Sequence, residues 1–488
     1  MSVWLLANIG NSDLQLTDTS LLPRDGDPNR WKSSRRLGEE LRDHLDRYRR
    51  VLHMPLLEPT LRWLFNREKV TGPDLKVVLF ASDQPREYTV EEEWLKDTAP
   101  IAEVIQALLT GEDFQIPKKN IRIERIDGNP ADYSNMLNFY SRILPEVSDQ
   151  TGGEERLYME VSGGTPAMTS MLIVMGVEVF GERVRTLYVD RGANRPYEVS
   201  VAHELFARKT RDTLRHQVEL HAYAVARRTL EQSGVLISSD DRRRRLLDSL
   251  LEYADRRLAF DFERARAALQ EARGLVTGEQ QARIQHWMHE LESPDSSDHL
   301  SELIHSASIK LRFGDYADFV QRVFRFQEAT FRYMLDQFGV QYSNREGKFI
   351  RSDWLKSQSG LSDFLKNYRN PSTGDPDEVK LDRPLNRFSL GAIVDFFVEK
   401  NSKWKRWQTV AQGLHRLSAV ADLRNKGISG HGFDGIGQAD LQNAYGESPE
   451  KLLAGLSAIY QTIFGKAPGP NPYDAINALI LDLIQASA

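Results

Sequence analysis

Leu157-Tyr-Met-Glu-Val-Ser-Gly-Gly-Thr-Pro-Ala-Met168 is the stretch that decides the fold of the first part of this chain. Residues 157–161 form an apolar run of strand length, and a pair of glycines follows it closely. An apolar helical pattern begins near Ala167, directly after the turn. A buried strand that leads through a tight turn into a helix is the repeating unit of α/β folds. The stretch therefore predicts a sheet that is covered by helices.

The same alternation extends over the first 200 residues. Strand patterns recur at residues 3–9, 76–80, 121–126 and 184–189, and helical patterns occur at 91–109 and 132–143. This order predicts a mainly parallel, Rossmann-like sheet with helices on both faces. After residue 201 the strand patterns stop and helical patterns follow. We therefore expect an α/β domain at 1–200, a helical linker region at 201–300 and an all-α domain at 301–488.

Polar and glycine residues follow three of the predicted strands, namely Gly-Asn-Ser-Asp at 10–13, Ala-Ser-Asp-Gln at 81–84 and Ser-Gly-Gly-Thr at 162–165. Ligands of open parallel sheets bind at the carboxyl ends of the strands. Gly163 and Gly164 let backbone amides approach a ligand, and Thr165 offers a hydroxyl at a helix start that favours anions. The turn thus predicts a phosphate cradle, although a purely structural turn explains it equally well. Gly-x-Gly-x-x-Gly and P-loop signatures are missing, which argues against NAD binding and ATP hydrolysis.

A second informative stretch lies at 414–434, near the end of the chain. Leu414, Leu417 and Ala421 define the apolar stripe of a helix, and Arg424 continues that stripe. Asn425 follows, glycines then end the helix, and a histidine arrives at position 431. An arginine, an amide and an imidazole in a small space suit chemistry on a phosphodiester.

The spacing from arginine to histidine is weak evidence by itself. The same spacing occurs in charged segments, where a solvated helix face explains it better: Arg47/His53, Arg211/His216, Arg215/His221 and Arg283/His289. The stretch at 414–434 differs because Arg-Asn ends an apolar helix and because glycines flank the histidine. In this context it resembles the active-site motif of HEPN ribonucleases, including the His-Gly-Phe-Asp continuation at 431–434.

RNA cleavage at this motif needs few groups, because RNA supplies its own nucleophile in the 2′-hydroxyl. His431 can act as general acid or base near neutral pH. Arg424 can bind the scissile phosphate, and Asn425 can orient the backbone or the nucleophile. No metal is required, and no zinc or two-metal ligand set is evident in the sequence. The HEPN resemblance further implies a composite cleft in a homodimer and products with a 5′-hydroxyl.

The first part of the chain is similar to CARF domains, the sensors of type III CRISPR defence. The resemblance rests on a first strand closed by Gly10, Asn11 and Ser12 and on the later turn of Ser162, Gly163, Gly164 and Thr165. It implies that these residues bind cyclic oligoadenylate across the twofold axis of a dimer. One departure is Pro166, where many relatives have a lysine that would help to neutralise the ring phosphates.

Together the two motifs resemble the stand-alone, Csm-associated CARF-HEPN ribonucleases of type III CRISPR systems. This resemblance implies non-specific cleavage of single-stranded RNA, switched on by cyclic tetra- or hexa-adenylate. Two alternatives stay open. One is a CARF sensor with an inactive HEPN half, and the other is a ring nuclease in which Ser12 or Thr165 orients the 2′-hydroxyl of the cyclic messenger.

Two tryptophans precede the arginine helix in Lys-Trp-Lys-Arg-Trp at 403–407. Cations interleaved with aromatic rings suit single-stranded RNA. Because the tryptophans are three residues apart, inward packing on one helix face is an equally good explanation. A single helix is expected from 404 to 423.

Composition excludes several classes of protein. Hydrophobic residues make up 40% and charged residues 27%, as in globular proteins. A formal net charge of -6 argues against an extended nucleic-acid surface, so RNA contact must be local and no stable DNA binding is expected. The absence of cysteine excludes disulfides and thiolate chemistry. Without a signal-peptide pattern or a bilayer-spanning run, we expect a soluble cytoplasmic protein.

Overall fold

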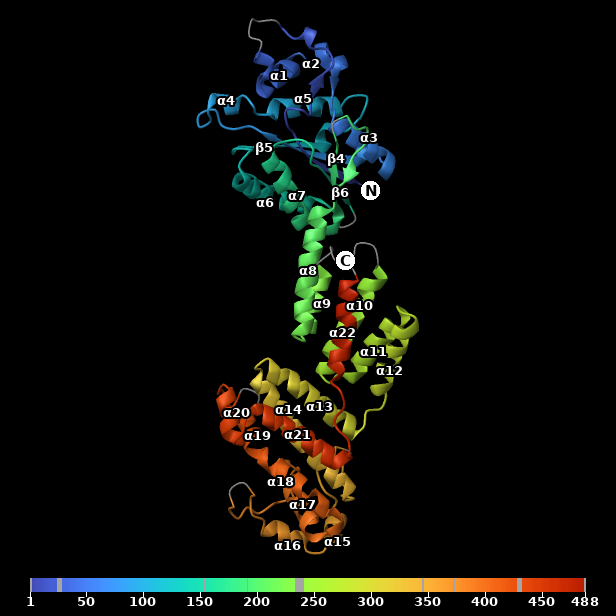
Figure 1. Cartoon of the computed structure of the whole chain (residues 1–488), viewed down its shortest axis with the longest axis vertical. Coiled ribbons are helices and arrows are strands. Elements are labelled where there is room, and N and C mark those ends of the chain that lie inside the picture. Colours follow the sequence, from blue (N-terminus) through green and yellow to red (C-terminus); the bar gives the residue numbers. More distant parts are fainter. Residues whose placement is uncertain are drawn as a thin grey trace. The chain divides into compact units, whose positions relative to one another are not determined.

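The structure is a computed structural model, and it describes residues 2–23, 29–152, 155–190, 192–232, 241–344, 346–371, 374–427 and 432–486 (Figure 1). The chain forms two compact units. The first contains Met1–Leu214 and is called the sheet unit here, and the second contains Asp241–Ala486 and is called the helical unit. The residues between these ranges are divided between the two units.

The sheet unit is built on six strands in the order β5-β4-β1-β6-β7-β8. Their bounds are β1 Val3–Asn8, β4 Leu75–Ser82, β5 Ile121–Ile126, β6 Arg156–Glu160, β7 Val184–Tyr188 and β8 Tyr197–Glu198. The first five are mutually parallel, and β8 pairs antiparallel with β7. A separate antiparallel pair joins β2 (Gln15–Leu16) to β3 (Leu52–His53). The predicted mainly parallel sheet is therefore confirmed.

Helices cover both faces of the sheet, and this explains why the sequence of β1 is apolar throughout. Leu5 and Ala7 belong to the core formed with α1 (Ser34–Asp43), α3 (Leu57–Glu68) and α5 (Ala99–Leu109). Trp4 and Leu6 point to the other face and pack in the core formed with α6 (Tyr133–Gln150) and α7 (Pro166–Phe180). Figure 1 shows α1 and α5 on one side of the sheet and α6 and α7 on the other.

The strand order reverses at β1. From β1 the chain adds β4 and β5 on one side, and it then crosses to add β6 and β7 on the other side. In open parallel sheets such a switch point opens a crevice at the carboxyl ends of the strands. The loops after β1 and β6, which the sequence singled out, lie together at this switch point.

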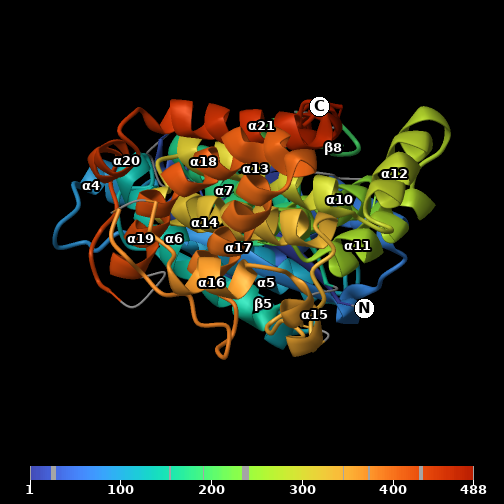
Figure 2. The ribbon, with the colours of Figure 1, turned by 90° about the horizontal axis from the view of Figure 1, so that it is seen from below.

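The helical unit is organised around α14 (Tyr316–Gln337), next to α13 (Ser296–Arg312), α17 (Arg387–Lys400) and α19 (Ser418–Lys426) (Figure 2). The other longer helices of the chain are α8 (Val201–Glu219), α9 (Tyr223–Gln232), α10 (Asp241–Leu258), α11 (Phe262–Gly274), α12 (Gly278–Glu290), α18 (Gln408–Arg416), α20 (Gln438–Tyr445), α21 (Pro449–Phe464) and α22 (Pro472–Gln485). The short helices are α2 (Leu45–Tyr48), α4 (Glu91–Trp94), α15 (Ser352–Ser357) and α16 (Leu361–Lys366). The predicted fold class, an α/β part followed by an all-α part, is confirmed. The predicted domain boundaries at residues 200 and 300 stay a prediction.

The prediction of a single helix at 404–423 is wrong. The structure divides this stretch into the 3-10 helix Ser402–Trp407, α18 and α19. The break falls at Leu417, without proline or glycine. Buried Gln327 of α14 donates its amide to the carbonyl oxygen of Leu414 at 2.6 Å and to Ser418 Oγ at 3.2 Å. A side chain inserted into the backbone ladder in this way is a common cause of a helix kink.

Trp404 and Trp407 pack inward, with only 7% and 3% of their surfaces exposed. Lys403 and Arg406 lie over the two rings. The inward-packing explanation of 403–407 therefore holds, and the tryptophan rings are part of the core.

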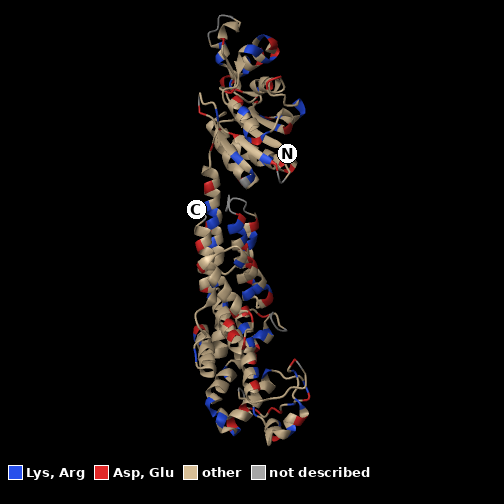
Figure 3. Ribbon diagram, turned by 90° about the vertical axis from the view of Figure 1, so that its right-hand side faces the viewer, with Lys and Arg blue, Asp and Glu red and all other residues tan. Residues whose placement is uncertain are grey.

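Lys, Arg, Asp and Glu are interspersed along the ribbon (Figure 3). No helix among the described residues is both long and apolar enough to cross a membrane.

Candidate functional site

The two glycine loops of the sheet unit touch each other at the switch point. A Cβ atom on Gly10 would lie 2.6 Å from the backbone nitrogen of Gly164, closer than real side chains approach. Gly164 has φ = 85°, a conformation that side chains other than glycine adopt at a cost. Both positions therefore require glycine, and the structure brings together the two predicted loops.

Asp13 and Glu160 are buried beneath these loops and were missing from the predicted site. Asp13 is 1% exposed, and its Oδ2 accepts a hydrogen bond of 2.6 Å from the Gly10 N–H. Glu160 is fully buried, and its Oε1 accepts the Ser162 N–H at 2.9 Å. A Cβ on Gly163 would overlap the Asp13 carboxyl group, so the loops close over it. Glu160 could have been identified from the sequence, because an acidic residue is rarely found in a strand that is buried on both faces unless it has a specific role.

Burial raises the pKa of both carboxyl groups. For Asp13 the desolvation is reinforced by the nearby Glu160, and the Gly10 N–H opposes it in part. For Glu160 the desolvation is opposed by hydrogen bonds from Ser162 and Gly163. Asp13 Oδ1 and Glu160 Oε2 have no hydrogen-bond partner. Two buried carboxyl groups that interact electrostatically favour the protonated state, so this pair resists holding two negative charges.

The remaining predicted residues of this site differ in their exposure and in whether their side chains already form hydrogen bonds. Asn11 and Ser12 are exposed at the rim of the loops. Ser162 Oγ accepts the Val189 N–H at 2.6 Å. The Thr165 hydroxyl donates to the carbonyl oxygen of Pro130 and accepts the Met168 N–H at 3.2 Å, so it caps α7. A hydroxyl held in this way is less available for catalysis than that of Ser12.

Pro166 occupies the first turn of α7 directly after the cap. Proline suits this position because its missing N–H would have no partner in the helix. Pro166 thus has a structural reason to be at this position.

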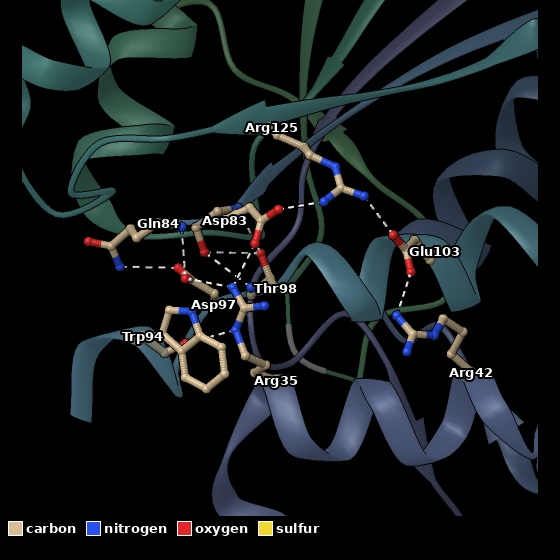
Figure 4. A network of polar contacts seen from close by, with 10 residues as sticks. Arg35, Arg42, Asp83, Gln84, Trp94, Asp97, Thr98, Glu103 and Arg125 are labelled. Atoms are coloured by element: carbon tan, nitrogen blue, oxygen red, sulfur yellow. Dashed lines mark hydrogen bonds and ion pairs between the residues drawn. The ribbon is translucent and has the colours of Figure 1, made fainter. Parts of the chain in front are cut away.

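The polar residues after β4, the third predicted strand end, form hydrogen bonds and ion pairs with other residues of the sheet unit (Figure 4). Asp83 receives hydrogen bonds from Arg35 at 2.6 Å and from Arg125 at 2.5 Å. Gln84 donates both its backbone N–H and its side-chain amide to Asp97, which also binds Arg35 at 3.0 Å. Arg35 lies on α1, so this network fastens the segment between β2 and β4 to the sheet. Its side chains are therefore engaged within the protein.

In the helical unit, Arg424 lies near the end of α19. Its guanidinium carbon is 4.4 Å from the ring centroid of Phe324, and its side chain is partly buried. Asn425 is exposed. His431 lies outside the described residues, together with 428–430. The sequence did not single out Phe324, because its place under Arg424 depends on the packing of α14 against α19.

The described residues on either side of 428–431 lie close to one another. The Asp434 N–H donates to the carbonyl oxygen of Lys426 at 3.1 Å, and Gly427 pairs with Asp434 in a parallel bridge. Gly432, the residue bonded to His431, lies so close to Lys426 that a Cβ would overlap its carbonyl oxygen. Residues 432–434 are therefore held against Lys426 and Gly427, which follow Arg424 by two and three residues in the chain.

Polar contacts to α14 and α17 hold α19 in place. Gln327 binds the helix start through Leu414 and Ser418, as described above. Arg387 of α17 donates to Asp422 at 2.7 Å and to the carbonyl oxygen of Ser418 at 2.9 Å. The position of Arg424 is thus determined by two neighbouring helices.

Across the described ranges, no three His, Asp or Glu side chains are grouped as metal ligands.

Comparison with known proteins gives two findings. Residues 289–481 match the family described as the Cas_Csm6 HEPN domain. The whole fold is similar to that of Enterococcus italicus Csm6 bound to cyclic hexa-2′-fluoro-hexa-dAMP, with a TM-score of 0.60, 13% identity, and coverage of 99% of this chain and 100% of the other. Comparison with curated proteins found no match.

Proposed function

We propose that this chain, which matches the Cas_Csm6 HEPN domain family over residues 289–481 and resembles a Csm6 protein in fold, is a metal-independent endoribonuclease of type III CRISPR defence. Its substrate is single-stranded RNA, cut without strict sequence preference. Its activator is a cyclic oligoadenylate that binds the sheet unit. The observation that carries the proposal is the HEPN match over the region in which the Arg424 guanidinium lies over the Phe324 ring, close to the bridge between Gly427 and Asp434.

The reaction uses groups of the chain and of the RNA. His431 takes the proton of the 2′-hydroxyl or gives a proton to the leaving 5′-oxygen. Arg424 binds the scissile phosphate and stabilises the charge that develops on it. Asn425 orients the nucleophile. The products carry a cyclic or terminal phosphate on one side and a 5′-hydroxyl on the other.

The stacked arginine supports this assignment. Resting on the Phe324 ring, the guanidinium has fewer conformations to lose when a phosphate arrives. The ring leaves the N–H edges of the guanidinium, which lie in its plane, able to donate hydrogen bonds. A preorganised arginine of this kind is more effective than a freely moving one.

The sheet unit is the proposed sensor. Gly10, Gly163 and Gly164 bring the two loops into close backbone contact, and Asn11 and Ser12 offer exposed polar groups at the rim of these loops. We propose that two protomers share one ring and present two HEPN sites to each other. Activation then requires that the ring binds the active arrangement more tightly than the inactive one.

The test is cleavage of a fluorescent single-stranded RNA by the full chain in EDTA. The RNA is offered without activator, with cyclic tetra-adenylate and with cyclic hexa-adenylate. Cleavage that depends on one ring supports the proposal and identifies the activator. Ring binding without RNA cleavage would favour a sensor with an inactive HEPN half. Loss of the ring in the absence of RNA would favour the ring nuclease.

A further inference from the structure

A cavity of about 610 Å³ lies within the helical unit, where the turn between α10 and α11 meets α13 and α14. Its lining residues include Phe260, Phe262, His299, Gln321, Arg322 and Arg325. Two arginines and a histidine line it, together with apolar side chains and no carboxylate. Its volume falls within the range of small-molecule sites, about 300–1,000 Å³. The lining therefore suits an anion that carries a flat ring.

Phe260 stands in an unusual backbone conformation. It follows α10 with φ = 61°, and its N–H donates to Arg257 O while the Asp261 N–H donates to Arg256 O, both at 2.9 Å. This hydrogen-bond pattern ends many helices, and glycine usually occupies the left-handed position. A bulky residue there costs about 1 kcal/mol or more relative to glycine. The chain retains phenylalanine, and its ring forms part of the cavity wall.

The aromatic rings of the cavity form a continuous surface. The centroids of Phe260 and Phe262 are 5.6 Å apart, and those of Phe262 and His299 are 5.7 Å apart. Both phenylalanines are only partly buried, so some ring surface stays accessible. Accessible aromatic rings are the usual stacking surface for unpaired bases.

The two arginines differ in how exposed their side chains are. Arg322 donates to Ser306 Oγ and to the carbonyl oxygen of Asp318, each at 3.2 Å, forms an ion pair of 3.6 Å with the Asp318 carboxylate, and is mostly buried. Arg325 is 61% exposed at its side chain and contacts Glu328 through Nη1 at 3.3 Å. An exposed guanidinium beside a fixed one provides positive charge for a phosphate.

The cavity is connected to the proposed catalytic site through α14. Phe324, which supports Arg424, immediately precedes Arg325, which lines the cavity. Consecutive helical residues point about 100° apart, so the two sites lie on adjacent faces of one helix. A single strand that passes over Arg424 can therefore reach the cavity along α14.

We propose that this cavity binds one nucleotide of the single-stranded RNA substrate, next to the scissile phosphate. The base stacks on Phe260 and Phe262, and its phosphate binds Arg325 and Arg322. This inference rests on the proposed ribonuclease function. It adds a substrate subsite that tolerates any base, because every base has a face that can stack.

The test measures the affinity of the full chain for a short fluorescent single-stranded RNA. His431→Ala is the background, so that the RNA is not cut during the measurement. Phe260→Gly removes the ring and relieves the backbone at that position. Arg325→Gln removes the exposed charge. Each change is expected to raise Kd about tenfold, because a base-stacking surface and a charge-assisted hydrogen bond to phosphate each contribute about that factor to binding. Phe260→Trp restores a stacking surface and is expected to restore the affinity.

The matched control is Arg264→Gln on α11. Arg264 is 69% exposed and has an i,i+3 ion pair with Asp261, so it resembles Arg325 in exposure and pairing but does not line the cavity. Its substitution is expected to change Kd less than about twofold. Equal losses for Arg264→Gln and Arg325→Gln would overturn the subsite, because general electrostatics would then explain both.

Cleavage with the intact catalytic residues separates this inference from the proposed function. Phe260→Gly is expected to raise KM with little change in kcat, and its thermal unfolding midpoint should stay near that of the original chain. An unchanged KM in an active enzyme overturns the subsite and leaves the ribonuclease assignment intact. An original chain that neither binds nor cuts RNA overturns both.

Discussion

The guanidinium of Arg424 lies over the ring of Phe324, with its central carbon 4.4 Å from the ring centroid. The two residues come from α19 and α14, which are about 100 residues apart in the chain. Arg424 was identified from the sequence, whereas Phe324, which positions it, was not.

Phe324→Leu is therefore expected to slow RNA cleavage while preserving the fold. A leucine fills much of the same space but offers no ring face, and a cation-π contact contributes about 1–2 kcal/mol when partly desolvated. We expect a rate about tenfold lower in single-turnover cleavage with saturating activator. Phe324→Tyr keeps the ring and should retain most of the rate. Equal rates for leucine and tyrosine would show that the ring face does not matter.

Arg424→Ala and His431→Ala are each expected to lower the cleavage rate by about 10²–10⁴, since each removes a group that acts on the reacting phosphodiester. Binding of cyclic oligoadenylate should be unaffected in both. Arg283→Ala and His289→Ala are matched controls, because this pair has the same kind of spacing in a charged helix. Retained cleavage in the Arg424 and His431 variants would refute the catalytic assignment.

Asp13→Asn is expected to make the protein less sensitive to rising pH. Burial raises the Asp13 pKa above its usual value of 3.8, so the folded state favours the protonated carboxyl group. That preference is fully present at low pH and is lost as pH rises through the raised pKa, because the folded protein must then hold a buried charge. Asparagine carries no charge at any pH.

Thermal unfolding from about pH 4 to pH 8 tests this effect. The advantage of Asp13→Asn over the original chain should grow with pH, by about 1.4 kcal/mol for each unit of pKa shift, or about 2–4 °C. Asp149→Asn, at an exposed position on α6, is the control and should follow the original chain. Parallel curves for Asp13→Asn and the original chain would contradict the raised pKa.

Gly164→Ala is expected to abolish activation by cyclic oligoadenylate. A Cβ at this position would lie 3.0 Å from the Asn8 Cβ, and φ = 85° disfavours alanine. Gly181→Ala is the matched control, because Gly181 also has a positive φ but no atom within 4 Å of its added Cβ. Both variants share a backbone cost of about 1 kcal/mol. Isothermal titration with the ring should show weakened binding only for Gly164→Ala.

Much of the fold follows from local sequence patterns. The apolar run of β1, the Gly-Gly turn before α7 and the absence of strand patterns after residue 201 predict an α/β part followed by an all-α part, and this is confirmed. These features are local, because strand, turn and helix preferences depend on neighbouring residues. Arg424 was identified in the same way, from the periodicity of its helix.

Contacts between distant segments decided the rest. The order of the strands places Gly10 against Gly164, and the burial of Asp13 and Glu160 beneath them depends on that order. The break at Leu417 depends on Gln327, which is 90 residues away in the chain. Periodicity predicts that a residue faces inward, but only tertiary packing decides which side chain it meets there. The sequence by itself thus determined which elements form and which loops carry polar groups, and the tertiary structure alone decided their partners.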